Sequence, residues 1–339
     1  MRALVTGATG CVGANIVAAL LARGYEVRAL RRPSSRLDAL AGLETDCVSG
    51  DVTEFESLLA AMAGCDLVFH AAAISQYWRN SRDTLYHVNV AGTRNVMRAA
   101  LACGVGRVVF TSSVAALGVP TYPGQLLDES AAFNLRPEQF HYGHSKLLAE
   151  AEVRRAVAQG LDGVVVNPVT VIGQRDINFV GGELLRTARA AQGGGLGSLA
   201  KRGLLRFAPS GGMGVVSART VGLGHVLAAE RGRTGERYIL NGENIGHRAL
   251  MAMVAEITGG PAPWFTLPRI LMGPFAAAID VFNRLRRKTP LVEGSQINLS
   301  ARDMYFDGGK AGRELGFPTL PARMAVEEAW AWYREHGTL

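Results

Sequence analysis

The chain has 339 residues and a formal net charge of +7, with 48% hydrophobic and 19% charged residues. This composition excludes a disordered chain, a fibrous repeat and a stapled mini-protein, and it predicts a folded protein with one large domain or two smaller ones. The basic residues are dispersed without interleaved aromatic platforms, so we expect no nucleic-acid partner and favour an anionic small molecule.

A strand, a glycine-rich turn and a helix open the chain. Residues 2–6 form an apolar run rich in strand formers, and residues 14–23 have helical periodicity. The GxxGxxG spacing between them is typical of a turn that brings backbone close to a pyrophosphate at a helix N-terminus. The sequence therefore predicts a dinucleotide site. Its loop residues are Gly7, Thr9, Gly10, Cys11, Val12 and Gly13, with Cys11 also expected to pack.

The end of the second predicted strand, residues 26–30, indicates the form of the dinucleotide. An NAD-selective site usually has Asp or Glu there, whereas this chain has Arg31 and Arg32. An arginine fork pairs with a 2′-phosphate, so NADP(H) is favoured, with NAD(H) or a solvated basic pair as alternatives. Asp51 and Val52 are expected near the adenine, although Asp51 also suits a turn.

Strands and helices then alternate, which predicts an α/β fold of Rossmann type with a doubly wound parallel sheet. Further strands are predicted at 46–48, 67–71, 107–111, 163–167 and 237–241, and helices at 54–63, 89–102 and 142–159. After Gly173 the alternation stops in a glycine-rich stretch. We expect residues 1–173 to bind the dinucleotide, with 215–242 returning to that domain, and residues 174–214 and 243–339 to form a smaller substrate-binding domain.

The four cysteines, Cys11, Cys47, Cys65 and Cys103, lack CxxC spacing and metal-ligand spacing. They predict neither a disulfide framework nor a zinc site, and they suit a reducing cytoplasm. The apolar N-terminal run is broken by Gly7 and Gly10, so no export signal or membrane span is expected.

A second apolar segment covers residues 270–282 and is interrupted by Gly273 and Pro274. Four basic residues follow it: Arg284, Arg286, Arg287 and Lys288. The proline break and the short length favour a packed helix over one that lies on a membrane surface, so membrane association is not expected.

Tyr142 and Lys146 have the i, i+4 spacing that places two side chains on one face of a helix. A phenol is a poor acid–base group at neutral pH, but an ammonium group nearby stabilises the phenolate, so we expect Lys146 to lower the pKa of Tyr142. Ser112 and Ser113 follow the strand at 107–111, at the carboxyl edge where doubly wound sheets bind ligands. This position of the two serines strengthens a catalytic interpretation of Tyr142 and Lys146.

Together these motifs resemble the extended branch of the short-chain dehydrogenase/reductase superfamily, the epimerase/dehydratase family. The resemblance covers nearly the whole chain. Its segments are residues 6–13, Asp51, residues 70–73, Asn89, residues 112–113, 142–146 and 167–168, and the tail 310–318. It implies a homodimer that pairs the helices carrying Asn89 and Tyr142.

The resemblance also implies roles for individual residues. Tyr142 would be the general acid/base, Lys146 would tune it and hold the nicotinamide ribose, and Ser113 would hydrogen-bond the reacting oxygen. Asn89 would support the site, with a capping or turn amide as the alternative, and His70 would lie beside the cofactor without acting as a catalyst. The other residues expected at the cofactor are Ala71, Ala72, Ala73, Asn167, Pro168, Val169 and Thr170.

Several reactions of this family compete. A sugar dehydratase would carry an acidic pair after the serine, where this chain has Val114 and Ala115, and epimerases commonly carry Val-Tyr-Gly where residues 116–118 read Ala-Leu-Gly. Residues 112–118, 167–173 and 235–244 resemble both dihydroflavonol-reductase-like proteins and hopanoid-associated sugar epimerases. The arginine pair favours an NADP(H)-dependent reductase of a ketone or aldehyde. The alternatives are a nucleotide-sugar 4-epimerase with tightly bound NAD(P) and a non-catalytic redox sensor.

Residues 184–229 contain no Asp or Glu but several basic residues: Arg186, Arg189, Lys201, Arg202, Arg206 and Arg219. They predict either an anion-binding lobe or a solvated loop. Residues 217–221 also depart from the acidic pair that relatives usually carry there, so family roles are not transferred to them.

Overall fold

A computed structural model describes residues 1–75, 79–177, 207–286 and 294–336. Seven strands form one sheet in the order β3-β2-β1-β4-β5-β7-β11, and every neighbouring pair is parallel. The strands are β1 (Arg2–Thr6), β2 (Glu26–Arg31), β3 (Asp46–Ser49), β4 (Leu67–His70), β5 (Arg107–Thr111), β7 (Gly163–Pro168) and β11 (Arg237–Leu240). This is the expected Rossmann-type α/β fold, whose ligands bind at the carboxyl ends of the strands.

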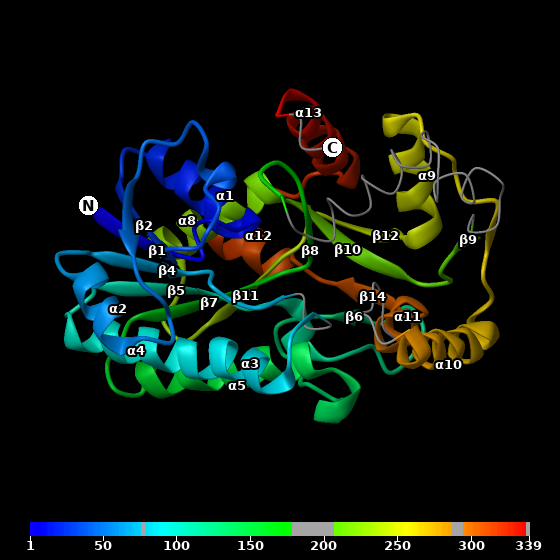
Figure 1. Cartoon of the computed structure of the whole chain (residues 1–339), viewed down its shortest axis with the longest axis horizontal. Coiled ribbons are helices and arrows are strands. Elements are labelled where there is room, and N and C mark those ends of the chain that lie inside the picture. The colour runs from blue at the N-terminus through cyan, green and yellow to red at the C-terminus, as the bar shows by residue number, and fades with distance from the viewer. Residues whose placement is uncertain (76–78, 178–206, 287–293, 337–339) are drawn as a thin grey trace.

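Helices cover both faces of this sheet (Figure 1). One layer contains α1 (Cys11–Leu21), α8 (Ala218–Arg231) and α12 (Gly309–Leu315). The other contains α2 (Phe55–Met62), α3 (Arg82–Tyr86), α4 (Gly92–Ala102) and α5 (His141–Val157), with the π-helical turn η3 (His87–Ala91) between α3 and α4. Residues 218–240 therefore return to the first sheet from a distant part of the sequence.

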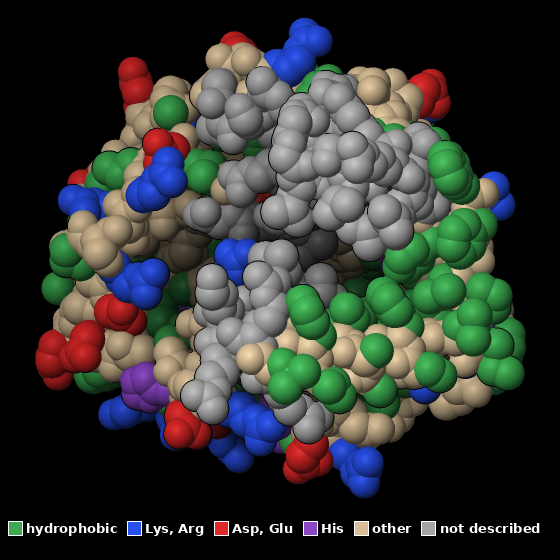
Figure 2. All heavy atoms as spheres, turned by 45° about the vertical axis from the view of Figure 1, so that its right-hand side comes forward, with side chains coloured by type: hydrophobic (Ala, Val, Ile, Leu, Met, Phe, Trp, Pro, Cys, Tyr) green, Lys and Arg blue, Asp and Glu red, His purple; other side chains and the backbone are tan. Residues whose placement is uncertain are grey.

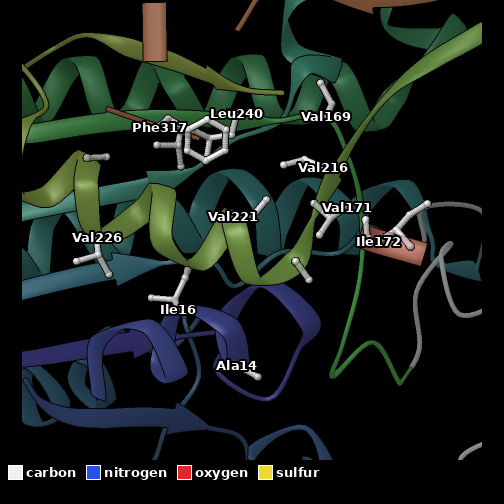
Figure 3. Packing of buried hydrophobic residues seen from close by; sticks show 14 of the residues in the cluster. Ala14, Ile16, Val169, Val171, Ile172, Val216, Val221, Val226, Leu240 and Phe317 are labelled. Atoms are coloured by element: carbon white, nitrogen blue, oxygen red, sulfur yellow. The ribbon is translucent and has the colours of Figure 1, made fainter. Parts of the chain in front are cut away.

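The close packing of α1 against α8 depends on Gly222. A Cβ atom there would overlap the carbonyl oxygen of Asn15, so the helix backbones touch at this point. Around it, Ile16 and Val221 are fully buried in the core between the two helices (Figure 3). A larger side chain at position 222 would push α8 away from the glycine loop that begins α1.

A second sheet lies beside the first (Figure 1). Its strands are β12 (Glu243–Gly246), β10 (Gly212–Ser217), β14 (Asp303–Phe306) and β6 (Leu126–Leu127), with β8 (Thr170–Ile172) pairing on β10. Helices α9 (His247–Thr258) and α13 (Ala322–Glu335) accompany it, and β9 (Phe207–Ala208) pairs with β13 (Phe265–Thr266). Only Val169 separates β7 from β8, so the two sheets meet at the carboxyl end of β7.

The packed helix expected for this apolar segment is α10, which runs over Arg269–Arg286 and continues through Gly273 and Pro274. Pro274 removes only the hydrogen bond to the carbonyl of Ile270, and Ile270 is 83% exposed, so water can satisfy that carbonyl. One face of α10 packs as expected, with Met272 and Ala276 against Ile297 of α11 (Gly294–Ser300). None of the helices in the described ranges has the length and apolarity needed to cross a bilayer.

Candidate active site

The glycine turn between β1 and α1 has two glycines that the fold requires and one that it does not. Gly7 has φ +68°, and a Cβ atom there would lie 2.6 Å from the nitrogen of Ala72, while at Gly13 it would overlap the carbonyl oxygen of Gly7. At Gly10 the nearest atom would be 3.4 Å away, an ordinary contact. The packing of the protein does not explain Gly10, whereas the close approach of a bound phosphate would.

This turn fits the pyrophosphate of a dinucleotide. Gly10 is the N-cap of α1 and offers no side chain to the first backbone N–H groups of the helix, which has no acidic residue in its first turn. Such uncapped N–H groups, together with the positive end of the helix dipole, bind anions. Gly7, Gly10, Cys11, Val12 and Gly13 all line one cavity of about 440 Å³.

The residues expected near the adenosine end lie outside that cavity. Arg31 ends β2, and its buried Nε makes no hydrogen bond within the described part of the chain, while Arg32 is exposed. Asp51 Oδ1 accepts hydrogen bonds from the Thr53 nitrogen at 2.9 Å and the Thr53 hydroxyl at 2.8 Å, so this carboxylate closes a turn. Val52 is buried in the core against α2 and α4.

The carboxyl end of β5 and the start of α5 bring Ser113, Tyr142 and Lys146 to the same cavity. Ser113 follows β5 and begins the short turn at Val114–Leu117, where its hydroxyl accepts a hydrogen bond from the Ala115 nitrogen at 3.2 Å. Tyr142 lies in the first turn of α5, and Lys146 lies one turn later on the same face. A hydrogen bond also joins the side chains of Ser113 and Tyr142.

The pKa of Tyr142 differs from the expectation. We expected Lys146 to lower it, but burial raises the pKa of Tyr142 to about 12, and the hydrogen bond with Ser113 acts in the opposite direction. The Lys146 Nζ donates instead to the carbonyl of Thr111 at 2.8 Å. Tyr142 is therefore protonated at neutral pH, the state that a general acid requires.

Lys146 is 3% exposed and lies with its Nζ 5.0 Å from the centre of the Phe110 ring. Burial lowers the pKa of Lys146 to about 8, and the nearby carboxylate of Glu150 acts against this shift. The lysine is thus charged below about pH 8, because its burial away from water disfavours the charged form at higher pH.

Glu150 is a buried residue of this centre that the sequence analysis missed. Its carboxylate is 1% exposed and accepts hydrogen bonds from the Ser112 hydroxyl at 2.6 Å and the Asn167 amide at 2.8 Å. The same Asn167 nitrogen donates to the Ser113 carbonyl at 3.0 Å. Positions 142, 146 and 150 share one helix face, so the i, i+4 pattern could have identified Glu150 if it had been extended by one turn.

Asn89 lies in the π-helical turn η3 and outside the cavity. Its Oδ1 accepts from the Ile74 nitrogen at 2.7 Å, and its Nδ2 donates to the Ile74 carbonyl and to the Ser145 hydroxyl. It therefore ties the loop after β4 to α5. Of the other residues expected at the cofactor, Ala71, Ala73, Pro168, Val169 and Thr170 line the cavity, whereas Thr9, Ala72 and Asn167 do not.

His70 is fully buried at the end of β4, between the hydroxyls of Thr6 at 2.7 Å and Thr93 at 3.0 Å. Burial is the main cause that lowers the pKa of His70 to about 3, with a contribution from Lys146. Both ring nitrogens have partners and the ring stays neutral, so the geometry gives it a structural role.

The far side of the cavity comes from the second sheet and α11. Its side chains are mostly apolar, among them Met213, Leu299, Met304 and Phe306. His247, at the start of α9, is a further lining residue that the sequence analysis did not single out. Burial lowers the pKa of His247 to about 4, so this wall carries no charge from it at neutral pH.

Within the part of residues 184–229 that the structure describes, no Lys or Arg side chain lines this wall of the cavity. Arg219 pairs with Glu328 of α13, whose other oxygen accepts from the Ser217 hydroxyl at 2.6 Å. The other basic residues of the stretch, Arg186, Arg189, Lys201, Arg202 and Arg206, lie outside the described residues. Among the described residues, no group of three His, Cys, Asp or Glu side chains is arranged to hold a metal ion.

Known proteins resemble this chain along its whole length. Residues 3–203 match the model of the NAD dependent epimerase/dehydratase family. A protein of Synechocystis sp. that is named as a dihydroflavonol 4-reductase is 40% identical over 340 residues, which cover 98% of this chain and 94% of that protein. Sterol demethylase protein B of Methylococcus capsulatus is 34% identical over 343 residues, which cover 100% of both.

A solved structure shows the same architecture. The crystal structure of gox2253 has a TM-score of 0.83 with this chain at 36% identity, and the match covers 100% of this chain and 99% of that one.

Proposed function

The chain belongs to the NAD dependent epimerase/dehydratase family and is an NAD(P)-dependent oxidoreductase, and from this premise we propose that it reduces a ketone or aldehyde with NADPH. Tyr142 serves as the general acid, Ser113 orients the carbonyl oxygen and Lys146 supplies positive charge beside them. The observation that carries this proposal is that Ser113, Tyr142 and Lys146 line one cavity together with the glycine turn, with Tyr142 hydrogen-bonded to Ser113. Reduction starts from a protonated acid, and this tyrosine is protonated throughout the neutral range.

The chemistry divides between the cofactor and the chain. NADPH, when bound, supplies the hydride that reaches the carbonyl carbon. Ser113 donates a hydrogen bond to the carbonyl oxygen, and Tyr142 gives it the proton as negative charge develops there. The hydrogen bond with Ser113, which opposes the rise in the pKa of Tyr142, stabilises the tyrosinate that remains. Lys146, charged below about pH 8, would donate to the nicotinamide ribose.

The carboxylate of Glu150 keeps this arrangement in place. It holds Ser112 directly, and through Asn167 it holds the backbone of Ser113. The glycine turn and the N-terminus of α1 hold the pyrophosphate. Arg31, whose buried Nε lacks a hydrogen bond among the described residues, is assigned to the 2′-phosphate that distinguishes NADPH from NADH.

The substrate is proposed to have an apolar skeleton. The wall opposite Tyr142 consists mainly of methionine, leucine and phenylalanine side chains, and Arg219 is neutralised by Glu328. A similar relative is named for sterol chemistry, which supports a bulky apolar substrate. A nucleotide sugar would need cations for its diphosphate, and the described part of the cavity lining has only Lys146, buried beside Tyr142.

A substrate panel tests the proposal against its main alternative. The protein is incubated with NADPH and a series of cyclic and aromatic ketones and aldehydes, and separately with UDP-glucose and UDP-galactose, while absorbance and products are followed. A reductase oxidises NADPH only with the carbonyl compounds. Inversion of the sugars without net oxidation of NADPH, together with an inert carbonyl panel, would favour a 4-epimerase, and binding of NADPH without any turnover would favour a redox sensor.

A further inference from the structure

The outward face of α10 is apolar along four turns of helix. Ile270 is 83% exposed, Val281 is 52% exposed and Leu285 is 78% exposed. With Pro274 and Ala277 these residues follow the i, i+4, i+7, i+11, i+15 spacing of a single stripe. Figure 2 shows hydrophobic side chains gathered over the part of the molecule where α10 lies.

The opposite face of the same helix is also apolar, because Met272 and Ala276 pack against Ile297 of α11. From Ile270 to Asn283 the only charged residue is Asp280, and its Oδ1 accepts a hydrogen bond from the Gly294 nitrogen at 2.8 Å, toward α11. A helix at a water interface normally places charges on its outer face, and a helix that is apolar all round is normally covered. The outer face of α10 therefore requires an apolar neighbour.

Positive charge flanks this apolar stripe at both ends. Arg269 precedes it and is exposed, and Arg284 and Arg286 belong to the last turn of α10. Between Glu256 and Glu293, Asp280 is the only acidic residue. An apolar helix face with basic flanks is the pattern of helices that lie in the interface of anionic membranes.

Contrary to the expectation from the sequence, we propose that α10 binds the protein to the surface of an anionic lipid bilayer, with Ile270, Val281 and Leu285 inserted among the acyl chains and the basic residues at the two ends of α10 at the headgroups. The outer face of α10 is less suited to packing against a second copy of this chain. Because both ends of the stripe are basic, pairing two α10 helices in either direction would place basic residues against basic residues, without a carboxylate on the face to pair with them.

The proposed membrane face also lies close to the substrate side of the cavity. The inner face of α10 packs on α11, and Gln296, Leu299 and Ser300 of α11 line the cavity. An apolar substrate dissolved in the bilayer would then be near its binding site, a consequence that rests on the proposed function. Membrane binding itself does not depend on that function.

Vesicle sedimentation of the full chain tests the proposal without substrate or cofactor. We expect binding to vesicles of phosphatidylglycerol and phosphatidylcholine in equal parts, weaker binding to phosphatidylcholine alone, and weaker binding at high salt. The double variant Ile270→Glu, Leu285→Glu should lose at least about tenfold in affinity, because two inserted apolar groups become charged. Met324→Glu on α13, which is 37% exposed, is the matched control and should bind as the unmodified protein does.

Three results would overturn the proposal. The first is no binding to anionic vesicles, and the second is equal binding by the double variant. The third is a dimer of the unmodified protein in light scattering that becomes a monomer in the double variant, because the face would then be covered by a second copy. Thermal unfolding followed by circular dichroism checks that the exposed substitutions leave the fold intact. Reductase activity on a small ketone in the absence of lipid is scored separately, so failure of one proposal is distinguishable from failure of the other.

Discussion

The hydroxyl of Ser112 donates a 2.6 Å hydrogen bond to the carboxylate of Glu150, and neither side chain is more than 3% exposed. Ser112 ends the segment that presents Ser113, whereas Glu150 lies two turns after Tyr142 on α5. The contact thus fixes the strand end that carries the hydroxyl relative to the helix that carries the acid. A buried carboxylate in this position also influences the charge of Lys146.

Replacing Glu150 with Gln should move the alkaline limb of the pH profile. The Glu150 charge raises the pKa of Lys146 against the effect of burial, so its removal lowers that pKa from about 8. We expect the fall of kcat/KM at high pH to begin about one pH unit lower. Glu152→Gln on the same helix, where Glu152 pairs with Arg94 and Arg155, is the control. An unchanged profile in Glu150→Gln would show that this carboxylate does not act on Lys146.

Replacing Tyr142 with Phe should remove the chemical step and leave cofactor affinity within about threefold, because only the hydroxyl is lost. General acid catalysis contributes typically 10²- to 10⁴-fold, so the single-turnover rate should fall by at least about 100-fold. Tyr122→Phe, at an exposed position, is the control. Retention of more than about a tenth of the rate would mean that another group is the acid.

Replacing Arg31 with Ala should weaken NADPH binding and leave NADH binding unchanged. A charge-assisted hydrogen bond contributes about 1.5–3 kcal/mol, so we expect a loss of at least about tenfold for NADPH in calorimetric titration. Arg36→Ala, which removes a residue paired with Asp38, is the control. Equal losses for both dinucleotides, or tighter binding of NADH than NADPH by the unmodified protein, would contradict the assignment.

Mild acid should destabilise the protein through three buried histidines. Burial lowers the pKa of His70 to about 3 and those of His225 and His247 to about 4, whereas each has a pKa near 6.5 when the chain unfolds. Between these values the unfolded chain binds more protons, so the free energy of unfolding decreases as pH falls below 6.5. The slope approaches about 1.4 kcal/mol per pH unit for each histidine.

Urea unfolding between pH 7 and pH 5 measures this slope. His225→Gln should reduce it by the contribution of one histidine, whatever its effect on stability at pH 7. A free energy of unfolding that stays constant or increases over this range would contradict the neutral, buried state of the three rings.

The sequence was sufficient for the strands of the first sheet and for the position of Tyr142 and Lys146 on one face of a helix. β1 and β5 begin and end as predicted, because each is an apolar run that stops at small or polar residues of a ligand-binding turn. The second sheet could not be predicted in the same way. Its strands β6, β8, β10, β12 and β14 have two to six residues each and pair across long sequence separations, so no local periodicity reveals them.

The raised pKa of Tyr142 could not be predicted from the sequence either, because it depends on tertiary packing. Spacing places Lys146 on the same helix face, but it does not show that the Lys146 ammonium donates to the Thr111 carbonyl or that both side chains are buried. Likewise, the apolar composition of residues 270–282 predicted a helix, whereas the exposure of its outer face depends on where α11 packs.

Transfer of a label from the cofactor tests the central claim most directly. The protein is given NADPH deuterated at the transferable position of the nicotinamide together with a carbonyl compound that it turns over, and the products are analysed by mass spectrometry and NMR. A reductase that works through Tyr142 forms one alcohol for each NADPH consumed, with deuterium on the carbinol carbon. Product that forms without stoichiometric consumption of NADPH, or an alcohol without deuterium on that carbon, would contradict it.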